Sequence, residues 1–451
     1  MTQLIPPQEL LSLLMYFVPC FTKPSFEYFV SYVVAMIAAT SRLTSTTVYR
    51  LSDRSKHYTN FSRFLSRYRW SVGELSQTLL DLLLRRIGLW RDGQGRRRLC
   101  LALDETIVEK SSTGMFGVAW QRNTHGGLCR GTHLLGHYWL MLGALLSVGG
   151  RTLCFPLGFR LYRQKKRCPE EQYRTPCELG LELLKSLKWP ERPDLVRTLI
   201  GDAGFASKEI LRWCAENGFV AIVRGRIDAR VADFFVGQPA PGRGRRRKYG
   251  AKIRLRTYAQ NESNFQQTIR LYRDQTEVRV GSVVGLHRCS GLPMRFVIAR
   301  RKEKPDVVVM STDLSLTPRE ILELYADRFA IEMAFRELKQ HFGVGHYQVR
   351  KPQAILRHVH LSGIACALTQ LFTLKPLKRG LCQGILHWRP MPWRKQNTPI
   401  SVNETRLLLR QACELETIYA QVGQIHGHVS KSELAAAAGI PPICQPKCAE
   451  L

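Results

Sequence analysis

The stretch Tyr325–Gly343 reads YADRFAIEMAFRELKQHFG. Its most reactive polar side chains recur at steps of three, four, four and three residues, which is the period of an α-helix. One aromatic hydroxyl, two guanidiniums, one carboxylate and one ammonium therefore share a single helical stripe: Tyr325, Arg328, Glu332, Arg336 and Lys339. A solvated face would mix the charge signs more evenly and would not need the tyrosine. The stripe predicts a helix with a functional surface.

The chain carries a large positive charge. Its 451 residues include 67 Lys and Arg and 36 Asp and Glu, which gives a formal net charge of +31. Cations spread along a chain favour a polyanionic partner, because they can neutralise phosphates. A generally basic protein is the alternative, and we favour nucleic acid as the direct partner. A hydrophobic content of 45% argues against disorder and allows sizeable cores.

Neither a membrane segment nor a disulfide framework is expected. The longest apolar runs, 28–40 and 137–150, are shorter than the roughly 18–20 residues that a membrane span needs. The N-terminal sequence MTQLIPPQEL lacks the positive region of a signal peptide. The 13 cysteines are scattered without a C-x-x-C pair, which favours reduced thiols and no zinc site. These features predict a cytoplasmic protein with no membrane partner.

The hydrophobic pattern divides the chain into five regions. Residues 1–92 are predicted to be helical, with two short helices around a turn that suit a helix-turn-helix-like DNA-binding unit; a basic helical bundle is the alternative. Residues 99–225 mix strands and helices and predict the first part of an α/β core with a mixed sheet. Residues 226–317 predict a β-rich insertion. Residues 318–375 return to the core with the glutamate helix and the helix that follows, and 376–451 form a basic, then helical, C-terminal region.

Other segments are predicted to be structural. Residues 91–98, RDGQGRRR, read as a linker between the helical and strand regions. Residues 251–259 read as one of the short strands of the insertion. Thr317 with Glu320 forms a capping box that opens the helix before Tyr325. The stretch His137, Tyr138 and Trp139 is predicted to belong to a core strand.

A basic glycine-rich loop in the insertion is a second candidate contact with DNA. It contains Arg243, Arg245, Arg246, Arg247 and Lys248. Five cations this close together repel one another unless a polyanion lies beside them. We favour a DNA contact, and a solvated turn is the alternative.

Three carboxylates are candidates for chemistry. Asp104 interrupts the apolar strand LALDET, and Asp202 ends the strand LIGDAGF before a glycine turn. Alone, each is more often a cap or a turn residue, although strand ends in α/β sheets are where ligand sites form. If both converge with Glu332, the carboxylates must share a cation or shift their pKa values. Such hard oxygen ligands suit two Mg²⁺ ions, which can promote an in-line phosphodiester displacement.

The glutamate helix resembles that of the DDE transposases of bacterial insertion sequences. In one group of this family the helix carries the Y-R-E-K signature: Tyr, two residues, Arg, three residues, Glu, six residues, Lys. Tyr325, Arg328, Glu332 and Lys339 fit it at every position. This match is specific, because four residue types recur at fixed spacings.

The two aspartates extend the resemblance. Asp104 matches the first catalytic aspartate on the first strand of an RNase H-like core, and Asp202 matches the second in its DAGF context. The gaps of 98 residues between the aspartates and 130 residues before the glutamate agree with a β insertion ahead of the glutamate helix. The resemblance covers about residues 40–370.

The resemblance implies an RNase H-like mixed-sheet core with a β-rich insertion and a helical N-terminal DNA-binding domain. Asp104, Asp202 and Glu332 would hold two Mg²⁺ ions, with Mn²⁺ able to substitute. The enzyme would nick DNA at the element end, and the freed 3′-hydroxyl would then attack another phosphodiester. Double-stranded DNA of the element ends and the target would be the partner, bound by a homodimer in the bacterial cytoplasm at the nucleoid.

The resemblance also implies that three residues of the stripe contact DNA near the cleaved end: Tyr325, Arg328 and Lys339. Arg336 is our own addition, as a phosphate contact or an ion-pair partner of Glu332. Three other readings stay open. These are a metal-dependent nuclease that never joins strands, a DNA-binding regulator without catalysis, and a decayed copy that only binds ends.

Overall fold

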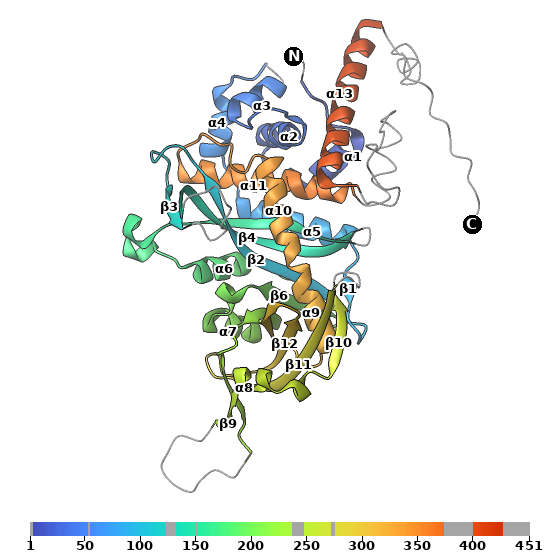
Figure 1. The fold of residues 1–451 in the computed structure, drawn as a ribbon. Helices are drawn as coiled ribbons and strands as arrows, with labels where there is room; N and C mark the ends of the chain where they lie inside the picture. Colours follow the sequence, from blue (N-terminus) through green and yellow to red (C-terminus); the bar gives the residue numbers. More distant parts are fainter. Residues whose placement is uncertain are drawn as a thin grey trace, which may run out of the picture.

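The structure, a computed structural model, describes residues 3–52, 55–122, 132–148, 151–236, 248–271, 276–373 and 400–426. One 13-stranded sheet runs through these residues, and helices cover both of its faces (Figure 1). The mixed α/β architecture predicted from the sequence is therefore present.

The first part of the chain is helical, as predicted. Its helices are α1 (Gln8–Leu14), the 3₁₀ helix η1 (Met15–Cys20), α2 (Lys23–Ala38), α3 (Ser45–Leu51), α4 (Thr59–Ser66) and α5 (Val72–Arg86). The short pair α3 and α4 lies around a turn. The Ser71 hydroxyl accepts hydrogen bonds from the first amides of α5, which satisfies donors that a helix start leaves open.

Two buried arginines fasten these N-terminal helices to helices from the end of the chain. Arg357 of α11 (Pro352–Leu371) donates to the carbonyl of Leu65 in the last turn of α4 and to that of Trp70 beyond the helix. Arg406 of α13 (Val402–His426) donates to two carbonyls at the end of α2. Helices α2, α4 and α11 share one continuous hydrophobic core with the sheet. A boundary at residue 92 stays a prediction.

The centre of the sheet is mixed. Strands β2 (Arg97–Glu109), β4 (His133–Val148) and β5 (Arg151–Tyr162) pair antiparallel, whereas β6 (Leu195–Gly201) and β7 (Phe219–Gly225) run parallel to β2. The edge strands β1 (Trp90–Arg91) and β3 (Ala119–Arg122) pair with β2 and β4. The connections contain α6 (Pro176–Lys185) and α7 (Lys208–Glu216), with the short turns η2 (Lys165–Arg167), η3 (Glu170–Gln172) and η4 (Ala203–Phe205).

The predicted insertion is rich in strands, and it extends the core sheet. Strand β13 (Lys304–Ser311) pairs antiparallel with β7 and joins the two parts. The other strands are β8 (Arg230–Phe234), β9 (Tyr249–Arg254), β10 (Gln267–Leu271), β11 (Thr276–His287) and β12 (Leu292–Arg301). The strand predicted over 251–259 is wrong in its second half. There α8 (Leu255–Gln260) forms, because Leu255 and Ala259 are buried one helical turn apart; η5 (Glu262–Asn264) follows.

The glutamate helix differs from the single helix that we expected. The capping box of Thr317 and Glu320 forms and opens α9 (Pro318–Asp327), and α10 (Phe329–Gln340) follows after a break at Arg328. There the amide of Arg328 donates to the carbonyl of Tyr325 at 3.2 Å, a tight three-residue step. The stripe thus continues across two helices rather than one.

The segment predicted as a linker is a hairpin with a buried ion-pair network. The Arg98 side chain has no exposed surface, and its guanidinium lies 3.0 Å from Asp92 and 2.5 Å from Asp313. It also donates to the hydroxyl of Thr198 on β6. Since Asp313 lies between β13 and α9, this network ties the start of β2 to the start of α9.

Within the described ranges, none of the helices combines the length and apolarity needed to cross a membrane. The nine cysteines of those ranges are all free thiols.

Candidate active site

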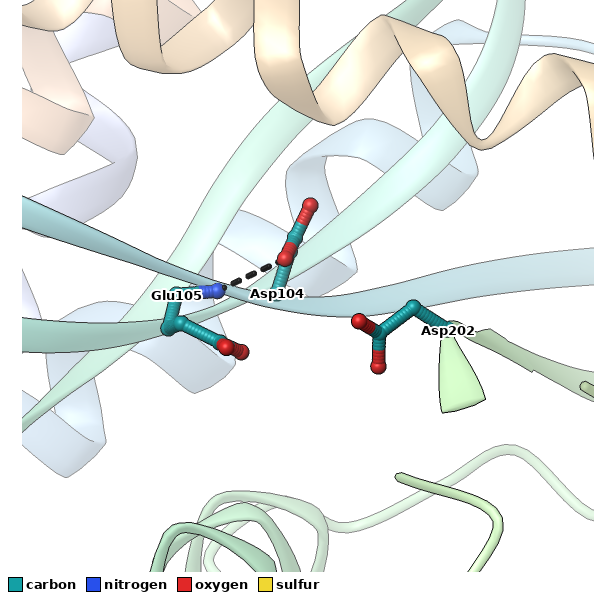
Figure 2. A group of neighbouring side chains, drawn as sticks. All are labelled: Asp104, Glu105 and Asp202. Carbon is teal, nitrogen blue, oxygen red and sulfur yellow. Dashed lines mark hydrogen bonds between the residues drawn. The ribbon is translucent and has the colours of Figure 1, made fainter. Parts of the chain in front are cut away.

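Asp104 and Glu105 are consecutive residues in the middle of β2. Successive side chains of a strand point to opposite faces of the sheet. Figure 2 shows the Asp104 carboxylate directed toward the helix above the sheet and that of Glu105 directed the other way. The backbone amide of Glu105 donates to Asp104 at 2.9 Å, which holds the aspartate carboxylate in place.

Asp202 reaches the same place from the neighbouring strand. Because β2 and β6 are parallel, with Leu103 opposite Gly201, the residues that follow in each strand become neighbours. Asp202 Oδ1 accepts from the amides of Gly204 at 2.8 Å and Phe205 at 3.3 Å. A Cβ atom on Gly204 would lie 3.1 Å from that oxygen, so the glycine of the DAGF motif lets the turn close on the carboxylate.

The three carboxylates form one cluster. Asp104, Glu105 and Asp202 each present an oxygen, and these oxygens lie within 4.8 Å of one another. Burial, followed by the charges of Asp104 and Asp202, raises the pKa of Glu105 to about 7. Burial also raises the pKa of Asp104, although the Arg328 guanidinium opposes it. The cluster is thus charged, partly desolvated and self-repelling, so that a cation would stabilise it.

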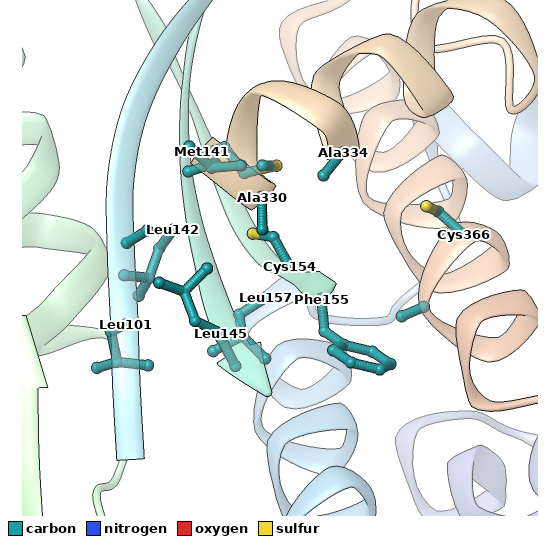
Figure 3. Close-up of a cluster of buried hydrophobic side chains, with 14 of the residues drawn as sticks. Leu101, Met141, Leu142, Leu145, Cys154, Phe155, Leu157, Ala330, Ala334 and Cys366 are labelled. Atoms are coloured by element: carbon teal, nitrogen blue, oxygen red, sulfur yellow. The ribbon is translucent and has the colours of Figure 1, made fainter. Parts of the chain in front are cut away.

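Glu332 faces this cluster from α10. The helix packs on the sheet through small side chains: Ala330 and Ala334 lie against Met141 and Cys154 (Figure 3). These alanines allow a close approach of helix and sheet, and α10 also contacts β2, the strand that carries Asp104. The Glu332 side chain is 45% exposed.

Arg328 joins Glu332 to the cluster. Its guanidinium donates to Asp104 at 2.7 Å and to Glu332 at 2.8 Å. The predicted triad Asp104, Asp202 and Glu332 is therefore brought to one place, with Arg328 between its first and third members. The ion pair that we considered between Arg336 and Glu332 is replaced by this pair with Arg328.

The remaining predicted contacts lie around the site. Tyr325 is half-buried and, with Arg224, Arg301 and Arg328, lines a cavity of about 220 Å³ between α9 and the insertion. Arg336 and Lys339 are exposed on α10, and Lys248 is exposed at the start of β9. The other four residues of the basic loop lie outside the described residues: Arg243, Arg245, Arg246 and Arg247.

Two residues of the site were not anticipated. Glu105 joins the cluster although only its neighbour Asp104 was singled out, and Tyr138 lies beside Glu105 and influences its pKa. His137 and Trp139 are buried, as the core-strand prediction requires. Tyr138, on the opposite face of β4, lies instead at the site. Strand alternation in HYW signals this difference, because one of three consecutive residues must face away from the other two.

Comparison with known proteins places the chain in a family. The DDE superfamily endonuclease family matches residues 16–282, which is more than half of the chain. The protein therefore belongs to the DDE superfamily of endonucleases, enzymes that cleave nucleic acid. The match includes Asp104, Glu105 and Asp202 and ends before Glu332.

Two solved structures show weak likenesses. The synaptic complex of piggyBac transposase with hairpin DNA is 11% identical, with a TM-score of 0.42 over 99% of this chain and 89% of that one. The NurA nuclease of Sulfolobus solfataricus is 9% identical, with a TM-score of 0.22 over 74% of this chain and 100% of that one. No curated protein matched.

Nucleases of this superfamily use divalent metal ions, and the donor set here fits such an ion. Carboxylate oxygens are hard ligands of the kind that Mg²⁺ and Mn²⁺ prefer. Three of them converge within 4.8 Å, and Glu332 stands beside them. Neither histidine nor cysteine belongs to this group, which disfavours a softer metal.

Added divalent metal is expected to stabilise the protein. A bound cation would relieve the repulsion among Asp104, Glu105 and Asp202, so Mg²⁺ or Mn²⁺ should raise the Tm by a few degrees at saturating concentration. Thermal unfolding monitored with increasing metal measures this shift. Asp202→Asn should lose most of it, and Asp194→Asn, which changes an exposed carboxylate elsewhere, should keep it. An equal shift in both variants would mean that the metal binds elsewhere.

Proposed function

We propose that this endonuclease is a DNA transposase of the Y-R-E-K group, encoded by a bacterial insertion sequence and acting on that element's own ends. The observation that supports this most strongly is the position of Glu332. Glu332, the carboxylate of the signature, is joined to Asp104 of β2 through Arg328. Two residues that were identified from their spacing in the sequence, Arg328 and Glu332, thus lie next to Asp104 of the core.

In this proposal Asp104, Asp202 and Glu332 hold two Mg²⁺ ions, and Mn²⁺ can replace them. When bound, such ions activate the attacking oxygen and stabilise the leaving oxygen of an in-line displacement. Glu105 offers a further carboxylate oxygen beside Asp104 and Asp202, which strengthens the preference of the site for a divalent cation.

The reaction has two steps on the same residues. Water first attacks the phosphodiester at the element end and releases a 3′-hydroxyl. This hydroxyl then attacks a second phosphodiester, so that one P–O bond forms and one breaks. The cations of the stripe hold the DNA during both steps, since contacts of Arg and Lys side chains with phosphates position DNA without depending on its sequence. The helical region 1–92 and the basic loop 243–248 would add further DNA contacts, and a homodimer would pair two ends.

The domain assignment follows the same proposal. Residues 99–225 and 318–375 would form the catalytic core, 226–317 the insertion, and 376–451 a basic, then helical, C-terminal region, whose helix α13 contacts α2. The second candidate function is a nuclease that cleaves without joining. Labelled DNA that carries the element ends, incubated with a plasmid target, separates the two. Joined products longer than the substrate support a transposase, whereas cleaved products alone support a nuclease.

Lys339→Ala is expected to weaken binding of the element end without unfolding the protein. Lys339 is exposed at the end of α10, so its loss should remove about one phosphate contact. The slope of the logarithm of the binding constant against the logarithm of the salt concentration should therefore become shallower by about one. Binding of a short end duplex across a range of salt concentrations measures this. Lys339→Arg should restore most of the affinity. Wild-type affinity and slope in the alanine variant would count against a DNA contact.

A further inference from the structure

A basic segment follows β5 at the edge of the sheet and has no role in the site described above. Between residues 160 and 174 the chain has six Arg and Lys and two Glu. Lys165, Lys166 and Arg167 form the exposed turn η2. The Lys165 ammonium lies 3.5 Å from Glu170, and these side chains are 66% and 85% exposed, so this pair neutralises little.

Side chains of this segment fix it to the loop around β3. Gln164 donates to the carbonyl of Trp120 at 2.7 Å, and Arg167 donates to that of Val118 at 3.0 Å. The Arg163 guanidinium lies 4.7 Å from the centre of the Phe116 ring. The two segments enclose a hollow of about 200 Å³. The cations are thus presented by an ordered framework.

Two aromatic rings are exposed within the same framework. Trp120 is 57% exposed and Phe116 36% exposed, although side chains of their size are usually buried. We call the whole area the β3–β5 surface and define it by six residues: Phe116, Trp120, Arg163, Lys165, Lys166 and Arg167. Cations beside exposed aromatic rings are the combination that nucleic acid contacts use.

A row of tyrosines connects the β3–β5 surface to the acidic cluster. Tyr138 lies beside Glu105, and its ring lies 5.2 Å from that of Tyr162. The Tyr162 ring lies 6.4 Å from that of Tyr173. Tyr162 is the last residue of β5 and directly precedes Arg163 of the β3–β5 surface. Consecutive phosphates of a DNA strand are about 3.4 Å apart along the helix axis, so the row spans only a few nucleotides.

This row lies on the face of the sheet opposite to α10. Glu105 and Asp104 point to opposite faces (Figure 2), and Asp104 is the residue that contacts the α10 side through Arg328. Arg160, two residues before Tyr162 on β5, pairs with Glu182 of α6. Figure 1 shows α6 on one side of β2 and β4, and α10 with α11 on the other. Arg160 therefore lies on the face of the sheet opposite to that of Arg328.

We propose that the β3–β5 surface binds target DNA, the duplex that receives the element end. This inference rests on the proposed function, because strand transfer needs two DNA segments at one set of carboxylates. The stripe of α10 holds the element end, and the β3–β5 surface, at the edge of the sheet, holds the second duplex. Flanking DNA is already covalently joined to the bound end, whereas target DNA arrives as a separate molecule and needs an affinity of its own.

The chemistry of the surface suits DNA of any sequence. Lysine ammonium groups act as point charges on phosphates, and aromatic rings stack without reading base edges. The Gln164 amide and part of the Arg167 guanidinium, which could read bases, are bonded to backbone carbonyls. Binding should therefore be independent of sequence and strongly dependent on salt.

The test compares two charge-reversal variants of the full chain. Lys165→Glu with Lys166→Glu changes the β3–β5 surface, and Lys185→Glu with Lys188→Glu makes the same charge change at two exposed lysines at the end of α6. Each is assayed for cleavage of a labelled end duplex, for joining of a pre-cleaved end to a plasmid, and for binding of a random-sequence duplex across salt concentrations. Because the four lysines are exposed, both variants should fold.

We expect the first variant to cleave ends at close to the wild-type rate, to join them to the plasmid at least about tenfold more slowly, and to lose about two units of salt slope on random DNA. Joining equal to that of the α6 pair would overturn the inference. An equal loss of cleavage and joining would also overturn it, since the surface would then hold the element end. If wild type cleaves no end in any metal, the proposed function fails, and the target assignment fails with it.

Discussion

Replacing Asp104 with asparagine is expected to reduce DNA strand cleavage by roughly a thousandfold, because a metal-binding carboxylate contributes several kcal/mol to transition-state stabilisation. Asp104 is central to the site. Its side chain is only 14% exposed, its carboxylate bonds to Arg328, and its neighbours in the cluster are Glu105 and Asp202. Asparagine has nearly the same shape but lacks the charge. Cleavage rates of a labelled duplex under single-turnover conditions measure the loss.

Two controls separate this effect from misfolding. Asp81→Asn makes the same change at an exposed carboxylate of α5, where asparagine can still accept the hydrogen bond from Gln77, and it should cleave normally. The Asp104→Asn protein should still bind end DNA with near-wild-type affinity, because asparagine removes a negative charge from the DNA-facing side. Normal cleavage by Asp104→Asn would remove this residue from the catalytic site.

Replacing Arg98 with methionine is expected to lower the free energy of unfolding by about 3–5 kcal/mol, the usual result of breaking a buried ion pair. The methionine chain fills part of the space but leaves the carboxylates of Asp92 and Asp313 with Arg96 as their remaining cation. Those carboxylates are 1% and 9% exposed, so water cannot solvate them well. Urea unfolding at pH 7 measures the change, and Arg97→Met, at an exposed pair with Asp194, should cost much less.

The pH dependence of stability gives a second test of the same network. Burial raises the pKa values of Asp92 and Asp313, but hydrogen bonds and the Arg98 charge outweigh it and hold both below the ordinary value. A lowered pKa in the folded state adds stability above the unfolded-state pKa of about 3.9, and this contribution is lost as the pH falls. Wild type should therefore lose stability between about pH 5 and 3 more steeply than Arg98→Met. Parallel curves would contradict the assigned pairing.

The sequence predicted the parts of the site that depend on local periodicity. A helical stripe can be read from spacing, and Asp202 follows from a strand that ends in a glycine turn. The mixed sheet follows from alternating strands and helices. The break at Arg328 was missed, because it coincides with side-chain bonds to Asp104, 224 residues earlier in the chain.

The parts that were missed depend on contacts between distant segments. Glu105 is one residue from a predicted ligand, but only the pairing of β2 with β4 brings Tyr138 to its carboxylate. Residues 91–98 looked like a linker because charge and glycine dominate them. Arg98 is buried there because Asp313, 215 residues away, supplies the opposite charge. The composition of a short segment carries no information about such a partner.

Glu332 connects the residues assigned by the family match with the residues assigned by the Y-R-E-K spacing. The family match contains both aspartates but ends before Glu332. The assignment of Glu332 to the site is therefore based on the Y-R-E-K spacing and on its hydrogen bond with Arg328. The proposed function therefore depends on a catalytic role for Glu332. It also depends on the joining of strands, which distinguishes a transposase from other endonucleases of the superfamily.

The most direct measurement is strand cleavage and joining on labelled DNA that carries the element's own ends, with Mg²⁺ and with EDTA, for wild type and Glu332→Ala. We predict metal-dependent nicks and joined products with wild type, and neither with the variant, while both proteins bind the ends. Binding without cleavage by wild type in either Mg²⁺ or Mn²⁺ would contradict the account and leave a DNA-binding protein. Cleavage by Glu332→Ala at the wild-type rate would remove the glutamate from the catalytic site.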